Sequence, residues 1–358
     1  MKKIVIVTGG SGGHVVPSIS LFEHLKDNFN VEIVTDLRGS KFIDKNKLNY
    51  SIIDVPNLFL NIYLFPIKIF KYLLTILNSI NYIKKNNISI IISTGGYMSL
   101  PFCVAANLLK KKIFLFEPNS VLGRSNKLIL KFSTKIICYD TDLKNFPTKY
   151  RKKKVVLSPI LKKQIYEVHK KSLDKPKNIK KILVIGGSQG ASFFDTTITE
   201  LIVEISKSQK IEIVQQISKN ENIYFIKKKY DKENIKHKFF KFTNDINEIY
   251  ADIDLAITRG GANTLSELSF LRIPYISIPL PSARDNHQYH NSNYYYKKNC
   301  CWLIDQNKFQ INDVFNLVFK IFNNDNEYKE KLNNLEIISK KNTWNNINNN
   351  IMEIINEN

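Results

Sequence analysis

Short β-branched apolar runs alternate with longer amphipathic stretches along most of this 358-residue chain. Each run is followed by apolar residues at helical spacing, an alternation typical of doubly wound α/β domains with buried parallel strands. The length is sufficient for two domains of ordinary size, each with its own core. The pattern predicts strands at residues 4–7, 31–35, 88–93, 113–116, 135–138 and 155–157 in a first sheet, and at 182–185, 211–215, 255–258 and 275–278 in a second.

The division between the two predicted domains falls in a polar part of the chain. The basic stretch 170–181 is typical of a surface connection, while Ser158-Pro159 offers an earlier boundary. We place the domains at 1–160 and 161–338. The tail from residue 323 keeps apolar side chains at helical spacing, so we expect it to be helical, with residues 339–358 packing back toward the first domain.

A glycine-rich turn follows the first strand of each predicted domain. Glycine lets a ligand approach the backbone closely, and the helix that begins after each turn offers unpaired N–H groups to an anion. Neither turn has the dinucleotide-binding spacing G-x-G-x-x-G, because Val15 and Gln189 stand where glycines belong, and neither is followed by Gly-Lys-Ser/Thr. Such a pair predicts two halves facing one cleft, with a nucleotide-linked substrate rather than a nicotinamide cofactor. The first turn consists of Gly9, Gly10, Ser11, Gly12, Gly13 and His14, and the second of Gly186, Gly187, Ser188, Gln189, Gly190, Ala191 and Ser192.

The chain is strongly basic, with a formal net charge of +21. A genome bias toward Lys, Asn and Ile explains part of this excess, and the alternative is an anionic partner, either nucleic acid or a membrane surface. No segment resembles an RNA- or DNA-binding module, so we expect no nucleic-acid partner and favour anionic phospholipid. The four cysteines have no metal-ligand spacing, and the first strand begins without a signal peptide before it, which predicts a reducing, cytoplasmic location.

One apolar segment, residues 58–83, raises the question of a membrane. Asn61, Pro66 and two lysines interrupt it, whereas a spanning helix needs about twenty apolar residues with few or no charges. Aromatic and aliphatic side chains beside lysines instead predict a segment that dips into the headgroup zone of an anionic bilayer. The alternative is a buried core helix preceded by an apolar loop. The lysines concerned are Lys68, Lys71, Lys84 and Lys85.

His14, at the end of the first turn, is the candidate general base, because an imidazole titrates near neutral pH and can accept a hydroxyl proton. The alternative is a histidine that only orders the loop or caps the helix. Two D-x-D sequences, at 140–142 and 252–254, match a short metal-binding pattern of nucleotide-sugar transferases. Three-residue matches arise by chance, and both are explained more simply as turns at helix ends, so we expect no metal and no cofactor.

The densest group of polar residues follows two strands of the second predicted sheet. Residues 258–267 follow one strand and residues 285–291 the next, so both project from the same sheet edge. A carboxylate such as Glu267 suits the paired hydroxyls of a ribose, while amides and Asp285 suit the hydroxyls of a sugar. Neighbouring glycines leave room for a pyrophosphate and present backbone donors.

At these residues the chain resembles the MurG family of peptidoglycan glycosyltransferases. The resemblance implies the GT-B fold, in which two Rossmann-like domains face a deep cleft. It also implies inverting transfer of N-acetylglucosamine from UDP-N-acetylglucosamine to the C4 hydroxyl of lipid I, giving lipid II without a metal. One departure is Leu161, which stands where the family commonly has an arginine. The matching segments, in the family's order, are 9–17, 95–97, 117–119 with Gly123 and Asn126, 186–192, 259–267, and 287–291.

The resemblance further implies roles for single residues in both halves. In the second domain, the backbone near Thr243 and Ile246 would contact uracil and Glu267 the ribose. The diphosphate would lie near Ser188, Gly261 and Ala262, and the donor sugar near Asp285, His287, Gln288 and Asn291. In the first domain, the turn Gly9, Gly10, Ser11, Gly12 and Gly13 would take the acceptor diphosphate, and His14, Tyr97 and Asn126 would line the reaction site.

The resemblance also implies partners and a location. The partners are UDP-N-acetylglucosamine, undecaprenyl-linked lipid I, anionic inner-leaflet phospholipid and other cell-wall synthesis proteins. The location is the cytoplasmic face of the inner membrane, as a peripheral protein. Two alternatives stay open: a UDP-sugar-dependent diacylglycerol glycosyltransferase, which shares the nucleotide half, and a non-catalytic nucleotide-sugar-binding protein, in which we would expect a degraded His14 turn.

Overall fold

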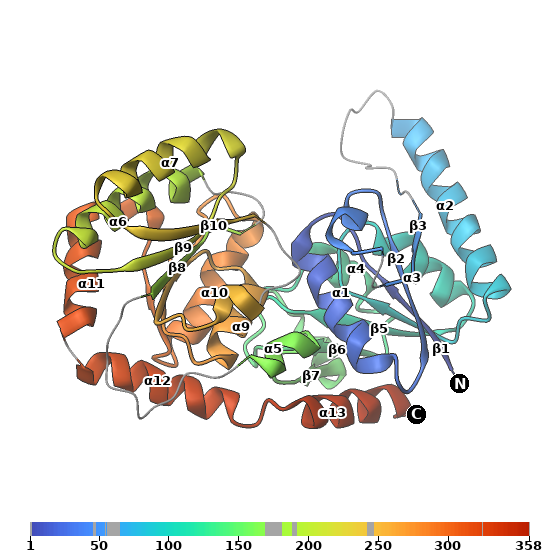
Figure 1. Cartoon of the computed structure of the whole chain (residues 1–358). Helices are drawn as coiled ribbons and strands as arrows, with labels where there is room; N and C mark the ends of the chain where they lie inside the picture. Colours follow the sequence, from blue (N-terminus) through green and yellow to red (C-terminus); the bar gives the residue numbers. More distant parts are fainter. Residues whose placement is uncertain are drawn as a thin grey trace. The chain divides into compact units, whose positions relative to one another are not determined.

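The computed structural model describes residues 2–45, 48–53, 55, 65–168, 181–187, 192–241, 247–323 and 325–357. The chain divides into two compact units, each with its own parallel sheet (Figure 1). Unit 1 consists of Met1–Lys163 together with Thr343–Asn358, and unit 2 of Gln164–Asn342. The chain therefore returns to unit 1 for its last helix.

Unit 1 is built on a seven-stranded sheet in the order β3-β2-β1-β4-β5-β6-β7, and every neighbouring pair is parallel. The apolar side chains of β1 have no exposed surface, as expected for a central strand with helices on both faces. The strands are β1 (Lys3–Val7), β2 (Asn30–Thr35), β3 (Tyr50–Ile52), β4 (Ile90–Ser93), β5 (Lys112–Glu117), β6 (Lys135–Cys138) and β7 (Lys154–Val156).

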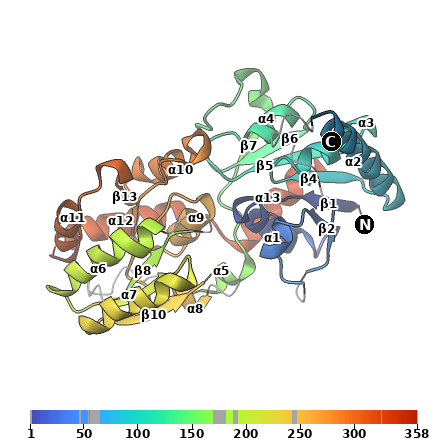
Figure 2. The same cartoon turned by 90° about the horizontal axis from the view of Figure 1, so that it is seen from above.

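The helices of unit 1 cover the two faces of this sheet separately (Figure 2). One face carries α2 (Phe65–Lys85), α3 (Ser99–Leu108) and α4 (Arg124–Ile129). The other carries α1 (Gly12–Leu25) and α13 (Trp344–Asn356). The short 3₁₀ turns η1 (Gly39–Phe42) and η3 (Thr148–Lys153) complete the unit, and α5 (Lys163–Glu167) begins at its boundary.

His24 joins α1 to the returning helix α13. Its ring stacks on Trp344 with centroids 3.8 Å apart, its Nδ1 contacts the Asn348 side chain, and its Nε2 lies 3.0 Å from the carbonyl oxygen of Leu161. Burial lowers the pKa of His24 by more than its hydrogen bonds to Asn348 and Leu161 raise it, so the net shift is downward. Four isoleucines of α13 are buried in the core of unit 1: Ile347, Ile351, Ile354 and Ile355.

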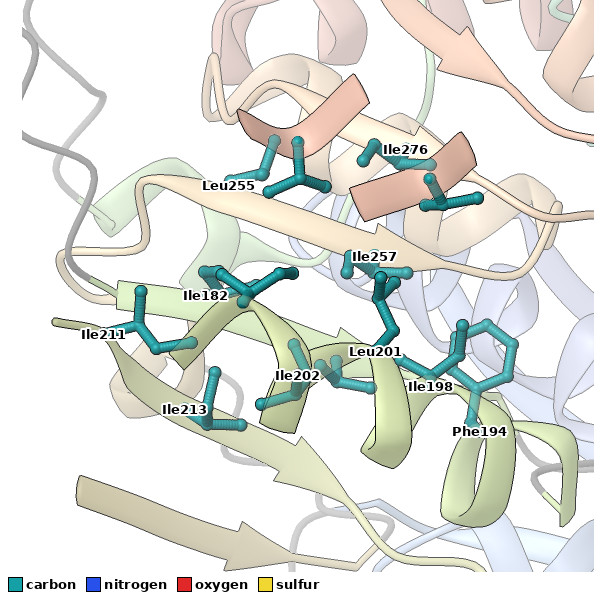
Figure 3. Packing of buried hydrophobic residues seen from close by; sticks show 14 of the residues in the cluster. Ile182, Phe194, Ile198, Leu201, Ile202, Ile211, Ile213, Leu255, Ile257 and Ile276 are labelled. Atoms are coloured by element: carbon teal, nitrogen blue, oxygen red, sulfur yellow. The ribbon is translucent and has the colours of Figure 1, made fainter. Parts of the chain in front are cut away.

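Unit 2 is built on a six-stranded parallel sheet in the order β10-β9-β8-β11-β12-β13. Figure 3 shows side chains of β8, β9, β11 and β12 packed with those of the helix that follows β8. The strands are β8 (Lys181–Ile185), β9 (Glu212–Gln216), β10 (Lys236–Phe240), β11 (Leu255–Thr258), β12 (Tyr275–Ser277) and β13 (Cys301–Leu303). The helices are a π-helical turn η4 (Phe194–Ile198) leading into α6 (Thr199–Ser206), then α7 (Asn220–Lys232), α8 (Asn247–Tyr250), α9 (Ala262–Phe270), α10 (His287–Tyr296), α11 (Ile311–Asn323) and α12 (Asp325–Ser339), with 3₁₀ turns η5 (Arg284–Asn286) and η6 (Gln306–Lys308).

All four cysteines are buried and unpaired. Burial raises the pKa of Cys103 and Cys138 to about 12 and that of Cys300 to about 11, and it also raises the pKa of Cys301. These thiols therefore remain protonated at neutral pH and pack as small apolar side chains.

Helix α2 includes the described part of the apolar segment. One of its faces packs against α3, while Ile67, Phe70, Leu74 and Leu77 are 41–62% exposed on the other. The helix is therefore not an ordinary buried core helix. Among the described helices, none is both long and apolar enough to cross a membrane. Residues 58–64 lie outside the described part, as does the Lys68 side chain.

Candidate functional site

Both glycine turns lie where the strand order of their sheet reverses. In unit 1 the chain goes from β1 to β2 on one side and later to β4 on the other, and in unit 2 β8 lies between β9 and β11 in the same way. Connections that leave adjacent strands in opposite directions open a crevice at the carboxyl ends of those strands, where α/β sheets bind ligands. Gly9 and Gly10 follow β1, and Gly186 and Gly187 follow β8, so the described part of each turn lies at such a position.

His14 lies at the start of α1, and the turn after β4 holds its ring. Its Nδ1 lies 2.9 Å from the carbonyl oxygen of Thr94. A carbonyl only accepts hydrogen bonds, so in the neutral ring Nδ1 carries the proton and Nε2 keeps its lone pair. Gly95 and Gly96 have φ values of +91° and +81°, and a Cβ on Gly95 would lie 3.2 Å from the imidazole. The contact fixes the tautomer that a general base requires.

Asn126 is buried close to this ring. Its Nδ2 donates to Glu117 Oε2 at 3.0 Å and to the Phe116 carbonyl at 3.2 Å. Within the described residues, the buried Asn126 Oδ1 has no hydrogen-bond partner. A buried amide oxygen without a donor costs free energy, so a ligand hydroxyl or a water is the expected partner. The structure therefore brings together His14 and Asn126, which were predicted to line one site.

The first turn itself is packed more tightly than the sequence shows. A Cβ on Gly9 would lie 2.9 Å from Asp36 Oδ1, and one on Gly12 would lie 3.3 Å from the Phe42 ring. Ser11 is the N-cap of α1 without a side-chain cap bond, and Gly13 is exposed. The glycines are thus required for space as well as for ligand access.

The Gly10 amide already has an acceptor within the protein. It donates to Asp36 Oδ1 at 2.9 Å, and the Gly39 amide donates to the same oxygen at 2.7 Å. The His14 amide also has an acceptor, the Ser11 carbonyl oxygen at 3.0 Å, so the prediction that the whole turn takes an anion now rests on the amides of Gly12 and Gly13, the first two residues of α1. Asp36 itself is only 1% exposed, and it is the first site residue that sequence reasoning missed.

Arg38 is the second residue that sequence reasoning missed. Its guanidinium pairs with Asp36 Oδ2 through Nη2 at 3.0 Å and Nε at 3.3 Å. It also lies over the ring of Tyr97 at 4.9 Å and donates to the Tyr97 hydroxyl. The predicted residue Tyr97 thus lies at the first turn, with a cation against it. The sequence signal that could have found these two residues is Asp-x-Arg, an aspartate and an arginine two positions apart, directly after β2.

In unit 2, Glu267 is buried in α9 and accepts a hydrogen bond from Tyr250. The Tyr250 hydroxyl lies 2.7 Å from Glu267 Oε2, and the Glu267 residue is 7% exposed. Burial raises the pKa of Tyr250 well above its ordinary value, and the neighbouring carboxylate raises it further. Tyr250 therefore remains a donor at all working pH values and orients the carboxylate that was predicted to bind ribose.

Gly260 allows α9 and α10 to approach closely. A Cβ at this position would lie 2.2 Å from the Gln288 carbonyl oxygen and 2.6 Å from Ser292 Oγ, so no larger residue fits. The buried Asn291 donates from Nδ2 to the Gly260 carbonyl at 3.0 Å. Asn291 was predicted at the donor sugar. In the structure it bonds to the backbone just before Gly261, which is the N-cap of α9, and Ala262, which is the first residue of that helix.

The remaining predicted sugar residues lie at the start of α10. Asp285 is exposed and has a φ of +53°. Asn286 follows with a φ of +52°, and together the two residues make a sharp bend before the helix. His287 Nδ1 lies 2.8 Å from the Arg284 carbonyl oxygen. Gln288 Oε1 accepts a hydrogen bond from the backbone N–H of Leu280 at 2.9 Å. The NH₂ group of the Gln288 side chain therefore points away from Leu280.

Three predicted donor residues, Ser188, Thr243 and Ile246, lie outside the described residues. The described start of the second turn shows Gly187 at a φ of +75°, with its amide 2.9 Å from Gln216 Oε1. The second residue of this turn therefore has a left-handed conformation, as Gly10 has in the first turn.

Arg259 is a buried cation at the carboxyl end of β11. Its Nη1 donates to the Ile278 carbonyl at 3.1 Å and to Gln306, and its guanidinium lies 4.7 Å from the centre of the Phe194 ring. Burial lowers the pKa of Arg259 to about 10, so it stays charged at neutral pH. Leu161, which replaces the family's arginine, is 3% exposed in unit 1.

The first D-x-D segment makes local turn contacts, and the second contacts the start of β8. Asp140 Oδ1 accepts the Asp142 amide at 2.8 Å, Asp142 pairs with Lys144 at 2.7 Å, and Asp254 Oδ2 accepts the Lys181 amide at 2.9 Å. In the part of the chain that is described, no group of three or more His, Cys, Asp or Glu side chains is arranged to hold a metal ion.

Two family models match the chain. The glycosyltransferase family 28 N-terminal domain matches residues 4–138, and the glycosyltransferase family 28 C-terminal domain matches residues 181–348. Each model falls on one half of the molecule and includes that half's glycine turn.

Similar proteins carry one enzyme name. The chain is 43% identical to a protein of Pelagibacter ubique, over 100% of this chain and 99% of that protein, and 35% identical to a protein of Rickettsia felis, over 94% and 95%. Both are named UDP-N-acetylglucosamine–N-acetylmuramyl-(pentapeptide) pyrophosphoryl-undecaprenol N-acetylglucosamine transferase.

Solved structures share the fold. Acinetobacter baumannii MurG superimposes with a TM-score of 0.79 at 20% identity, covering 99% of this chain and 100% of that one. Phytolacca americana UGT2, in complex with UDP-2-fluoro-glucose and pterostilbene, gives 0.69 at 12% identity over 99% and 98%. The predicted GT-B fold is thereby confirmed.

Proposed function

This chain belongs to glycosyltransferase family 28, and we propose that it transfers N-acetylglucosamine from UDP-N-acetylglucosamine to the C4 hydroxyl of the N-acetylmuramyl unit of lipid I, forming lipid II and UDP. The observation that carries the proposal is the 43% identity to the Pelagibacter transferase along the whole chain. The intact His14 turn supports catalysis over mere binding of a nucleotide sugar.

The proposed chemistry needs one base and one set of donors. Nε2 of His14 accepts the proton of the C4 hydroxyl as its oxygen forms a bond to the anomeric carbon of N-acetylglucosamine. The bond from that carbon to the phosphate oxygen breaks, and its electron pair leaves with UDP. Attack from the face opposite UDP inverts the configuration and gives a β-linkage. Backbone amides at helix N-termini stabilise the charge that develops on UDP.

In this proposal the donor is held by unit 2. Glu267, oriented by Tyr250, accepts hydrogen bonds from the ribose hydroxyls. The start of α9 at Gly261 and Ala262, with Ser188, lies at the diphosphate. Gln288 and Asp285 contact the sugar, while Asn291 supports the Gly260 backbone. The backbone at Thr243 and Ile246 contacts uracil.

The test is a comparison of acceptors. Purified protein is mixed with UDP-N-acetylglucosamine and either lipid I or diacylglycerol, and the products are identified by mass spectrometry. We expect lipid II from the first mixture and no glycolipid from the second. Glycosylated diacylglycerol would identify the chain as a lipid glycosyltransferase. UDP binding without product from either acceptor would instead indicate a nucleotide-sugar-binding protein.

We also propose that unit 1 binds the anionic inner leaflet peripherally through α2. The support is the exposed apolar face of Ile67, Phe70, Leu74 and Leu77, which repeats at helical spacing. Lys71 lies within this stretch, and Lys84 and Lys85 follow in the last turn. Lysines near an anionic surface each add about 1 kcal/mol of attraction, and salt screens this term.

Liposome flotation tests this surface. Binding is expected to increase with anionic lipid content, decrease with salt, and weaken in a Phe70→Ser, Leu77→Ser variant. Ile337→Ser in unit 2 is the matched control, because Ile337 is also exposed, at 70%. If the α2 variant and the control float like the parent protein, α2 is not the membrane-binding face.

A further inference from the structure

Arg38 lies beside the first glycine turn and is held in one orientation. Asp36 Oδ2 pairs with its Nε and Nη2, and Tyr97 supports it both by ring stacking and through the hydroxyl. Its Nη2 lies 3.6 Å from the point where a Cβ on Gly10 would be. The side chain is nevertheless 51% exposed. A half-exposed guanidinium is thus fixed directly against the backbone of Gly10.

The carboxylate beneath Arg38 does not face a ligand. Asp36 is 1% exposed, and both of its oxygens are engaged: Oδ1 by the Gly10 and Gly39 amides, and Oδ2 by Arg38. The accessible group at this position is therefore the cation. Among the hydrogen bonds of the described residues, those of Arg38 use Nε and Nη2, which leaves Nη1 for a ligand.

The same turn carries the proposed base. A Cβ on Gly96 would lie 3.1 Å from the Gly9 carbonyl oxygen and 3.6 Å from Cδ2 of His14, so the Gly9 backbone and the His14 ring pack against the same glycine. Arg38 and His14 therefore flank a single short stretch of backbone. A ligand that contacts His14 therefore lies at the same turn as Arg38.

We propose that Arg38 binds the diphosphate of the acceptor and that Asp36 is its positioning residue. This inference rests on the proposed function and adds a phosphate-binding cation to it. The two N–H groups of Nη1 can each donate to a phosphate oxygen, and a side chain held in place before binding loses little freedom on binding. The donor also contains a diphosphate, but the predicted donor residues belong to unit 2, whereas Arg38 belongs to unit 1.

Steady-state kinetics on the full-length protein test the proposal. The acceptors are a short-chain lipid I analogue and its counterpart with a single phosphate in place of the diphosphate. The variants are Arg38→Gln, Arg38→Lys and the control Lys41→Gln, which removes an exposed positive charge from η1, the element next to Arg38. Thermal unfolding confirms that each variant is folded.

Arg38→Gln is expected to raise KM for the diphosphate acceptor by at least about tenfold, because a charge-assisted contact is lost. The increase should be smaller for the monophosphate acceptor, and KM for UDP-N-acetylglucosamine should stay within about twofold. Arg38→Lys should restore the acceptor KM only in part, since a lysine cannot keep the contacts to Asp36 and Tyr97 while presenting two further N–H groups to a phosphate. Lys41→Gln should match the parent protein.

Several outcomes would overturn the inference alone. They are an unchanged acceptor KM in Arg38→Gln, an equal increase for both acceptors, and an increase confined to the donor KM, which would assign Arg38 to the UDP diphosphate. Absence of transfer by the parent protein would overturn the proposed function and this inference together.

Discussion

Replacing Glu267 by glutamine keeps the size of the side chain but removes its charge. Glu267 is 7% exposed, and its carboxylate accepts a hydrogen bond from Tyr250 at 2.7 Å. A glutamine oxygen can keep that bond, so the fold should survive. Loss of a charge-assisted hydrogen bond to a ribose hydroxyl costs about 1.5 to 3 kcal/mol. At about 1.4 kcal/mol for each tenfold change, the dissociation constant for UDP should rise by about 10- to 150-fold.

Isothermal titration with UDP measures this change directly, since it needs no acceptor. Glu248→Gln is the matched control: Glu248 also lies in unit 2, but its side chain is 83% exposed and pairs with a surface lysine. The control should bind UDP like the parent protein. A Glu267→Gln protein with an unchanged melting temperature and a UDP affinity within twofold of the parent would refute the assignment of Glu267 to the ribose.

Three further predictions concern the base, metals and pH. His14→Gln should lower kcat by about 10² to 10⁴ while UDP affinity by titration is retained, and a kcat within a few fold of the parent would reduce His14 to a loop-ordering role. Activity should persist in EDTA, and a loss that a divalent cation reverses would revive a metal role for Asp140 and Asp142. Because burial lowers the pKa of His24 below its ordinary 6.5, the unfolded chain binds the extra proton first, so stability should fall as pH drops below about 6.5. Thermal unfolding should show that the melting temperature falls less with decreasing pH in His24→Gln than in the parent protein. An equal fall in both proteins would contradict a contribution of His24.

Most central strands could be predicted because each is buried on both faces and therefore appears as a continuous apolar run. The runs 135–138 and 255–258 match β6 and β11 at both ends, and the other predicted strands agree within two residues. Three strands were missed: β3, β10 and β13, all at or next to the edges of their sheets. Edge strands are short and partly exposed; in β10 the lysines at 236 and 238 alternate with half-buried residues, which hides the pattern.

Candidates for the site could be named from the sequence where local motifs carry the chemistry. His14, Glu267 and the glycine turns stand out because each lies in the turn or the helix that comes after a predicted strand. Asp36 and Arg38 could not be given a role, because their meaning depends on contacts with Gly10 and Tyr97, which lie on other segments of the chain. The support of Glu267 by Tyr250 is likewise a tertiary contact between two helices.

The return of the chain to unit 1 sets an order on protein synthesis. Ile347, Ile351, Ile354 and Ile355 of α13 occupy the core of unit 1, yet a ribosome makes them only after all of unit 2. Unit 1 is therefore first in the sequence but last to be completed, which reverses the usual tendency of domains to fold in the order in which they emerge. Until α13 arrives, the face of α1 that will carry it stays open to solvent and to chaperones. A premature stop codon near the end of the message would thus damage the half of the molecule that is encoded first.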